Sequence, residues 1–307
     1  MSNRPNSNKR ITSQIFNYAS DSYLERTSRH IYALVFLLPF VVLYELGTIL
    51  INTDLLHQTQ IRVVAFAWLQ ELAEHIGLGR RAVWIGAPLM VVIMLLALQL
   101  ASRKRWSFHV KDILPMTAEC VIYAFPLIVL SMLFNRPFID NAWQVQRALQ
   151  NQSVIEGAPS NDEVTVQNNI AEDRLNVSNR SVRMFWAPVV TGIGAGIYEE
   201  FVFRMVLILV LVIVFQDIIG FNHRNSVIIA VIISAICFSL HHHVYPLNGQ
   251  IESGEPFRVA AFIFRMFAGV YFAALYALRG FGMAAGTHTF YNIIATSVNV
   301  LFAGQVE

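Results

Sequence analysis

The fold is decided by one stretch of the sequence, in which residues 184–220 read MFWAPVVTGIGAGIYEEFVFRMVLILVLVIVFQDIIG. Almost all of it is apolar, as expected of a helix that crosses a lipid bilayer. Before Asp217, its charged residues are Glu199, Glu200 and Arg204. An ionisable side chain at membrane depth costs at least about 2.5 kcal/mol on insertion scales, so three together indicate either mutual pairing or chemistry.

The rest of the chain has the composition of a membrane protein. Hydrophobic residues make up 55% of the 307 residues, charged residues make up only 14%, and the mean hydropathy is +0.51. A soluble domain carries roughly 25% charged residues. Six further apolar runs are near the roughly 20 residues that cross a bilayer: Ile31–Ile51, Val83–Ala101, Ile113–Phe134, Ser226–Leu240, Phe257–Leu278 and Met283–Ala303. We predict an all-α, polytopic bundle of seven transmembrane helices, or eight if residues 184–220 form two spans.

Basic residues predict the orientation. The N-terminal tail and the loop at residues 102–112 are rich in Lys and Arg, whereas Val244–Pro256 has neither. Since basic loops stay in the cytoplasm, we expect the N-terminus inside and Val244–Pro256 outside, in a bacterial inner (plasma) membrane. We expect no removable signal peptide, because no short apolar run with a small-residue cleavage site precedes Ile31. The net charge of +2 is not that of a nucleic-acid-binding protein, so the expected partners are the bilayer and a protein or peptide.

Four segments follow from these patterns. Residues 1–30 form a cytoplasmic tail, 31–134 hold three front helices, 135–183 form a polar extracytoplasmic loop, and 184–307 form the rear helical core. Residues 135–183 are rich in Asn, Ser, Asp and Glu, which predicts a solvated, partly disordered loop.

Between the first two spans, Arg62–Gly79 shows a helical repeat of apolar residues. The repeat consists of Val63, Phe66, Leu69, Leu72 and Ile76. This spacing predicts an amphipathic helix that lies on the outer surface.

The charged residues of the first stretch divide into two roles. Glu200 and Arg204 are four residues apart, so they share a helix face and can form an ion pair. Glu199 points about 100° away and is left to face a cavity.

Two later segments carry histidines. Residues 238–243 read FSLHHH, in which Phe238 and His242 share a helix face, so His241 and His243 are interpreted as interfacial. Residues 288–292 read HTFYN, in which His288 and Asn292 share a face. Gly282 and Gly286, just before His288, predict close approach of another helix.

The ordered set EExxxR, FxxxH and HxxxN, from Glu199 to Asn292, resembles the CAAX-protease and bacteriocin-processing (CPBP, Abi) family of intramembrane endopeptidases. The resemblance implies that Glu199 is the general base and shares an activated water with His242. It implies that His288 and Asn292 stabilise the oxyanion, while Glu200 and Arg204 hold the helix register. The expected activity is hydrolysis of a peptide bond in a membrane-presented protein or peptide.

A metal-dependent mechanism is the alternative within that activity. One Glu and two His, here Glu199, His242 and His288, are a known ligand set for catalytic zinc. The HExxH motif is absent, and metal-independent chemistry is slightly favoured, with no cofactor required.

Two other functions remain open. The chain could be a non-enzymatic peptide-binding or immunity-type protein of the same fold, or a transporter in which the buried charges form an ion path. A structural role is favoured for the other intramembrane charges, Glu45, Glu119 and Arg265, and Arg265 is a candidate counter-ion for one of the glutamates. In straight, untilted helices, His242 and His288 would lie roughly 15 Å apart along the membrane normal, so they meet only if helices tilt or break.

Overall fold

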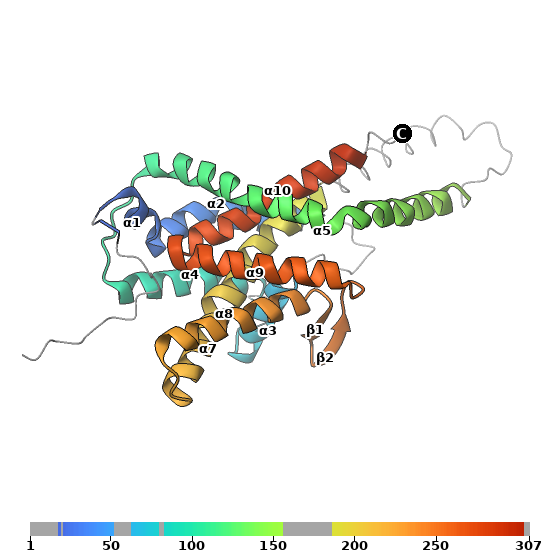
Figure 1. Cartoon of the computed structure of the whole chain (residues 1–307). Helices are drawn as coiled ribbons and strands as arrows, with labels where there is room; N and C mark the ends of the chain where they lie inside the picture. Colours follow the sequence, from blue (N-terminus) through green and yellow to red (C-terminus); the bar gives the residue numbers. More distant parts are fainter. Residues whose placement is uncertain (1–17, 20, 52–62, 80–82, 156–185, 304–307) are drawn as a thin grey trace, which may run out of the picture.

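The computed structural model describes residues 18–19, 21–51, 63–79, 83–155 and 186–303 (Figure 1). These residues form a helical bundle with one small hairpin, which confirms the all-α polytopic prediction. The elements are α1 (Tyr23–Thr27), α2 (His30–Ile51), α3 (Val64–His75), α4 (Val83–Ser102), the 3-10 turn η1 (Val110–Asp112), α5 (Ile113–Ile155), a helix over residues 186–200, the π-helical η2 (Phe201–Leu207), α7 (Ile208–Ile213), the π-helical η3 (Val214–Ile218), α8 (His223–Leu240), β1 (Val244–Leu247), β2 (Gln250–Ser253), α9 (Val259–Arg279) and α10 (Phe281–Ala303).

Among the described residues, six helices are long and apolar enough to cross a membrane: His30–Leu50, Ile85–Ser102, Val110–Phe134, Trp186–Ile218, His223–Leu240 and Val259–Arg279. Large apolar side chains such as Leu43, Ile122 and Phe125 are exposed on their outer faces, where lipid would cover them. The predicted seventh span, α10, has 23 residues and packs among these helices, but it does not belong to this set of six. The seven-span count therefore stays a prediction.

Residues 186–218 form one continuous helical segment rather than two spans that meet near Arg204. The segment has 33 residues, or about 50 Å at 1.5 Å per residue, against a bilayer core of about 30 Å. It crosses the other helices obliquely in Figure 1, where it is yellow. A helix of this length must tilt or extend beyond the bilayer core.

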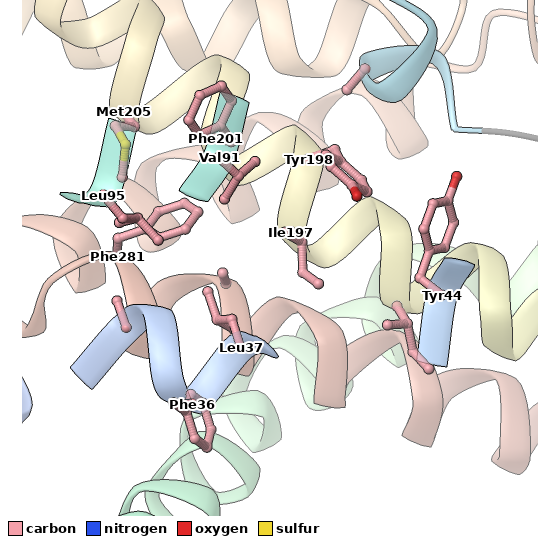
Figure 2. Packing of buried hydrophobic residues seen from close by; sticks show 14 of the residues in the cluster. Phe36, Leu37, Tyr44, Val91, Leu95, Ile197, Tyr198, Phe201, Met205 and Phe281 are labelled. Carbon is pink, nitrogen blue, oxygen red and sulfur yellow. The ribbon is translucent and has the colours of Figure 1, made fainter. Parts of the chain in front are cut away.

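The 186–218 segment also forms much of the buried core. Figure 2 shows Ile197 and Phe201 in one cluster with Leu37 of α2, Val91 of α4 and Phe281 of α10. Because these side chains come from four parts of the chain, the cluster fixes the helix that carries Glu199 against the front helices.

Glycines allow α10 to lie close to its neighbours, as predicted for Gly282 and Gly286. A Cβ atom at Gly282 would come within 2.8 Å of Ala33 in α2, and one at Gly286 within 2.6 Å of Phe36. On the other side of α10, a Cβ at Gly192 would lie 2.8 Å from the Cβ of Asn292. Larger residues at these positions would push α10 away from the helices that it contacts.

Helix α5 is longer than the sequence analysis predicts. It continues to Ile155, whereas the front block is expected to end at residue 134. Phe138, Ala142, Val145 and Leu149 recur at three- and four-residue spacing in this part, which is a helical pattern within the polar segment. The remainder of the predicted loop, residues 156–183, lies outside the described residues, as does most of the tail.

The amphipathic helix of the Arg62–Gly79 segment is present as α3. Val63, Phe66 and Leu69 are buried as predicted, but Leu72 and Ile76 are more than half exposed. Only the first two turns of the predicted apolar stripe therefore pack on the bundle.

A β-hairpin follows α8 within the loop that is expected to lie outside. β1 and β2 pair antiparallel, with Leu247 opposite Gln250. Asn248 and Gly249 at the turn both have positive φ angles, of 51° and 74°, the conformation that two-residue hairpin turns require. The hairpin lies at the opposite end of the bundle from α1, which approaches the end of α9 through a contact between Thr27 and Arg279 (Figure 1).

The other intramembrane charges have partners. Arg279 pairs with Glu119 at 2.6 Å, and Tyr198 donates a hydrogen bond to Glu45 at 3.3 Å. Arg265 pairs at 2.6 Å with Glu255, in the segment between β2 and α9. The prediction that Arg265 is the counter-ion of an intramembrane glutamate is therefore wrong, because its guanidinium contacts Glu255, which precedes the start of α9.

Candidate active site

The two adjacent glutamates lie where a regular helix changes its winding. Residues 186–200 are α-helical, and π-helical turns begin at Phe201, directly after Glu200. Glu199 is 5% exposed and Glu200 is completely buried, so both carboxylates face the interior of the bundle rather than lipid. Single π-helical turns inside α-helices are frequent at functional sites.

Arg204 neutralises Glu200, as their spacing predicts. Its Nε lies 3.1 Å from Glu200 Oε2, and both side chains are at most 1% exposed. The guanidinium also lies over the ring of Phe238, 4.0 Å from its centroid, and 5.5 Å from that of Phe272. Cation–π contacts of this kind strengthen in desolvated surroundings, so Arg204 is held by the carboxylate and by rings from two other helices.

His288 lies between the two glutamates. Its Nδ1 is 2.8 Å from Glu200 Oε1, and its Nε2 is 4.0 Å from Glu199 Oε2. The imidazole stacks on Phe272, with the ring centroids 4.5 Å apart and the planes 20° apart. The ring is therefore fixed from two directions, and one of its nitrogens faces the carboxylate predicted to be reactive.

His241 is the nearest histidine to Glu199 among the described contacts, and the sequence analysis assigned it wrongly. Its Nε2 lies 3.5 Å from Glu199 Oε1, and the side chain is 5% exposed, so it is not interfacial. The helix face shared by Phe238 and His242 was derived for a continuous helix, but α8 ends at Leu240 and a turn follows. The predicted His242 still reaches the site, since a ring nitrogen of His242 lies within 4.8 Å of ligand atoms of Glu199 and His241.

The third histidine of the run has a different environment. His243 is buried, and its Nδ1 donates toward the backbone carbonyl of Glu255 at 3.0 Å. Its ring packs on Phe257 and Phe262, near the start of α9. Thus His243 holds the base of the hairpin and does not contact Glu199.

Asn292 is not brought to the carboxylates. Its side-chain amide donates a hydrogen bond to the backbone carbonyl of Gly192 at 3.0 Å. Gly192 precedes Glu199 by seven residues, about 10 Å along a helix. The described contact of Asn292 is therefore a link between α10 and the 186–200 helix.

The histidines converge on Glu199 although straight helices would keep His242 and His288 apart. His241 approaches one oxygen of Glu199 from the end of α8, and His288 approaches the other from the second turn of α10. Residues 186–218 run obliquely to the other helices (Figure 1), and these two contacts place Glu199 between α8 and α10.

One wall of the site comes from the surface helix α3. The ring of Trp68 lies 6.0 Å from His241 and 6.1 Å from Phe203. The Trp68 indole N–H donates to the carbonyl of Pro246 in β1 at 2.6 Å, and the backbone N–H of Asn248 donates to the Glu71 carboxylate. α3 and the hairpin therefore meet beside the histidine cluster at one end of the bundle.

The donor set is compatible with a metal ion, although not as predicted. Among the described residues, the group that offers three ligand atoms within 4.8 Å of one another is Glu199, His241 and His242. The predicted set has His288 in place of His241, but His288 does not belong to this group, and its Nε2 lies 4.0 Å from Glu199 Oε2. One carboxylate and two imidazoles are donors that suit zinc, with a fourth position for another ligand.

Comparison with known proteins agrees with the motifs. The family model described as type II CAAX prenyl endopeptidase Rce1-like matches residues 181–294, a range that includes every site residue from Glu199 to Asn292. Residues 181–294 are therefore similar to the CAAX-protease family, and this similarity supports a membrane endopeptidase with a peptide or protein substrate. No curated protein and no solved structure matches the chain.

Proposed function

We propose that the chain is an intramembrane endopeptidase that hydrolyses a peptide bond of a membrane-presented protein or peptide, with Glu199 as general base. One observation carries the proposal: the nearly buried carboxylate of Glu199 is met by histidines from two other parts of the fold, at 3.5 and 4.0 Å. Purely structural buried carboxylates are expected to be paired with a cation, as Glu200 is with Arg204.

The residues supply the functions that peptide hydrolysis requires. Glu199 accepts a proton from the attacking water, and His242 shares that water from the end of α8. The same proton then passes to the leaving amine, because a group that accepts it in the first step can donate it in the second. Glu200 and Arg204 fix the helix and the ring of His288.

His288 is the proposed donor for the developing oxyanion. His288 donates through Nε2 when that nitrogen carries a proton, while its Nδ1 contacts Glu200. Asn292 acts instead as a positioning residue, because its hydrogen bond to the Gly192 carbonyl links α10 to the helix that carries Glu199. Loss of a single oxyanion donor typically reduces turnover about 10²–10³-fold.

A zinc-dependent form of the same activity would use Glu199, His241 and His242, where the ion would act as a Lewis acid on the scissile carbonyl. The residues of the first mechanism keep their positions in either case, so the reaction class does not depend on this choice.

The location of the site bears on the substrate. His241 and His242 directly precede the hairpin, at the end opposite to α1 (Figure 1). With the N-terminus in the cytoplasm, as the basic loops predict, the site lies toward the extracytoplasmic face. This favours the non-lipidated segment of a membrane protein or peptide over a prenylated tail made in the cytoplasm.

The test is cleavage in vesicles that contain the purified protein in defined orientation. Fluorogenic peptides should be offered in three forms: anchored by a transmembrane segment, carrying a prenylated CAAX tail, and free in solution. We expect cleavage of the first form and products that mass spectrometry locates near the membrane surface. Binding of all three without any cleavage, unchanged in a Glu199 and His242 double variant, would favour the peptide-binding alternative.

A further inference from the structure

The β-hairpin beside the histidines has a defined pattern of backbone hydrogen bonds. In a hairpin with a two-residue turn, the closing pair, here Leu247 and Gln250, exchanges hydrogen bonds, and the pairs along the two strands then alternate. Pro246 and Ile251 form the next pair, so the backbone groups of both point away from the partner strand. The carbonyl of Pro246 confirms this pattern, because it accepts a hydrogen bond from Trp68 of α3.

The outer edge of β1 is closed, whereas the outer edge of β2 is open. Pro246 has no N–H, and its carbonyl is bonded to Trp68. On β2, the N–H and C=O groups of Ile251 and Ser253 point to the outer side, because neither residue exchanges hydrogen bonds with β1. All four residues of β2 are exposed, and within the described part of the chain β2 pairs only with β1. The outer edge of β2 therefore presents two donors and two acceptors.

This edge leads to the proposed active site. After β2, the N–H of Gly254 donates to the carbonyl of His243 at 2.9 Å. The N–H of Glu255 then donates to the carbonyl of His242 at 2.8 Å. A Cβ atom at Gly254 would clash with the carbonyl oxygen of His242, so the two backbones are in contact. Since Glu255 follows Ser253 by two residues, about 7 Å in an extended chain, a strand paired with β2 passes within a few residues of His242.

A membrane-presented substrate needs hydrogen-bonding partners of this kind. The N–H and C=O groups inside a helix are bonded to one another, so a transmembrane segment has to unwind around the peptide bond that is cut. Unwinding leaves these groups without partners, which is costly where water is scarce. The edge of a β-strand supplies such partners, and extended peptides bind to strand edges in many proteins.

We propose that the substrate binds as an extended strand along the outer edge of β2 and exchanges backbone hydrogen bonds with Ile251 and Ser253. The hairpin then becomes a three-stranded sheet, and the cut bond lies near His242. Glu252 takes no part in this pairing, because its backbone groups face Tyr245 and its side chain lies on the other face of the hairpin from Ile251. This binding mode rests on the proposed function, because the added strand is the substrate of that reaction. It selects a segment that unwinds next to the membrane.

Backbone methylation of the substrate tests the pairing without any change in the protein. The transmembrane peptide of the vesicle assay is synthesised with one N-methyl group at a time, at residues about three to ten positions from the cut bond on either side. Each N-methyl group removes one donor. We expect kcat/KM to fall at least about fivefold at two positions that are two residues apart, and less than about twofold at the residue between them. Equal losses at all positions, or none, would overturn the pairing with β2 and leave the proposed function intact.

A proline in β2 tests the same hydrogen bond from the side of the enzyme. Ile251→Pro removes an outward N–H but no bond within the hairpin, and edge strands tolerate proline at such positions. KM for the transmembrane peptide should rise about fivefold with kcat nearly unchanged, because the lost bond forms equally in the ground state and the transition state.

The matched control is Val259→Pro, which places a proline at the exposed first residue of α9. Proline is favoured at the first position of a helix, and the preceding Arg258 already has the extended backbone that proline requires, with φ of −135° and ψ of 120°. Its KM should stay within about twofold of the wild-type value. The same KM in Ile251→Pro and Val259→Pro would count against a hydrogen bond from Ile251 to the substrate.

Disulfide trapping identifies the occupant of the edge independently of cleavage. Ser253→Cys is combined with Glu199→Gln, and the full-length protein in vesicles is mixed with transmembrane peptides that each carry one cysteine. We expect disulfides with peptide positions that are two residues apart and not with the residue between them. Glu199→Gln alone is the control, because it retains Cys120 and Cys237.

The outcomes of trapping separate the two proposals. Disulfides that form only between two copies of the protein would show that a second copy occupies the β2 edge, which would overturn the pairing with substrate. Trapping without alternation, or none, would also overturn it. Alternating disulfides with peptides that the wild-type protein never cleaves would overturn the proposed function alone.

Discussion

The imidazole of His288 donates from Nδ1 to the carboxylate of Glu200 at 2.8 Å, which joins α10 to the helix that carries both glutamates. The contact gives Glu200 two partners, because Arg204 lies on its other oxygen. It also directs Nε2 of His288 toward Glu199. Glu200 thus positions the imidazole ring that faces Glu199.

Replacement of His288 should affect turnover more than stability. His288→Gln removes the ring that faces Glu199, so kcat should fall about 10²–10³-fold with little change in KM. Glu200 keeps its ion pair with Arg204, so the protein should remain folded. The matched control is His243→Gln, because His243 lies at the base of the hairpin. The kcat of this variant should stay within a few-fold of the wild-type value. Equal kcat values for the two variants would refute the role of His288.

A methyl group at Gly196 should disturb the site from a distance. A Cβ atom there would clash with the side-chain hydroxyl and backbone of Thr289, next to His288. Overpacking of this kind typically costs 1–3 kcal/mol, and we expect Gly196→Ala to lower both the melting temperature and kcat. Gly79→Ala is the matched control, because nothing lies within 4 Å of a Cβ at that position. Identical melting curves for the two variants would show that α10 is not closely packed at Gly196.

The hydrogen bond from Trp68 to Pro246 should stabilise the hairpin. Trp68→Phe keeps an aromatic ring near His241 but removes the donor, which should cost about 1 kcal/mol. Amide hydrogen exchange in β1 and β2 should become roughly fivefold faster, since local opening sets the exchange rate. Trp106→Phe, at a half-exposed tryptophan between α4 and η1, should leave hairpin exchange unchanged. Unchanged exchange in Trp68→Phe would mean that α3 does not hold the hairpin.

Acid should weaken the contact between Glu25 of α1 and Arg29, which lies in the turn before α2. Burial of Glu25 acts to raise its pKa, but the hydrogen bonds and charge of Arg29 outweigh burial and hold the pKa below its usual 4.5. A carboxyl group whose pKa is lowered in the folded state stabilises the fold at pH values above its unfolded-state pKa of about 4.3. This stabilisation is lost as the pH falls through the folded-state pKa. The melting temperature should therefore drop below about pH 4, and Arg29→Gln should show a smaller drop.

The control for this pH dependence is Arg103→Gln, which alters an exposed arginine of the loop after α4. Its melting temperature should follow pH as the wild type does. A wild-type pH profile in Arg29→Gln would show that Glu25 gains no stability from Arg29.

Residue spacing was sufficient where a helix is continuous. It predicted the ion pair of Glu200 with Arg204 and the close approach of α10 at Gly282. Each of these depends on a helix that continues through the residues concerned, a condition that long apolar runs meet.

Spacing was insufficient where a helix ends. α8 stops at Leu240, so the face shared by Phe238 and His242 did not predict that the neighbouring His241 reaches Glu199. The hairpin has a sequence signal in Asn248-Gly249, the dipeptide that favours a two-residue turn. This signal is local and was not used to predict a hairpin in the loop after α8. The approach of His241 and His288 to Glu199 depends on how the helices tilt relative to one another. Packing between helices determines this tilt, so the pattern within one helix cannot predict it.

The most direct test of the account is the cleavage rate of Glu199→Gln in vesicles, with a transmembrane peptide as substrate. The substitution preserves size and removes the charge, so kcat should fall about 10²–10⁴-fold while the melting temperature stays near that of wild type. Glu252→Gln makes the same change on the exposed strand β2 and should cleave at the wild-type rate. Cleavage by folded Glu199→Gln at the wild-type rate would contradict the central claim that this carboxylate activates the water.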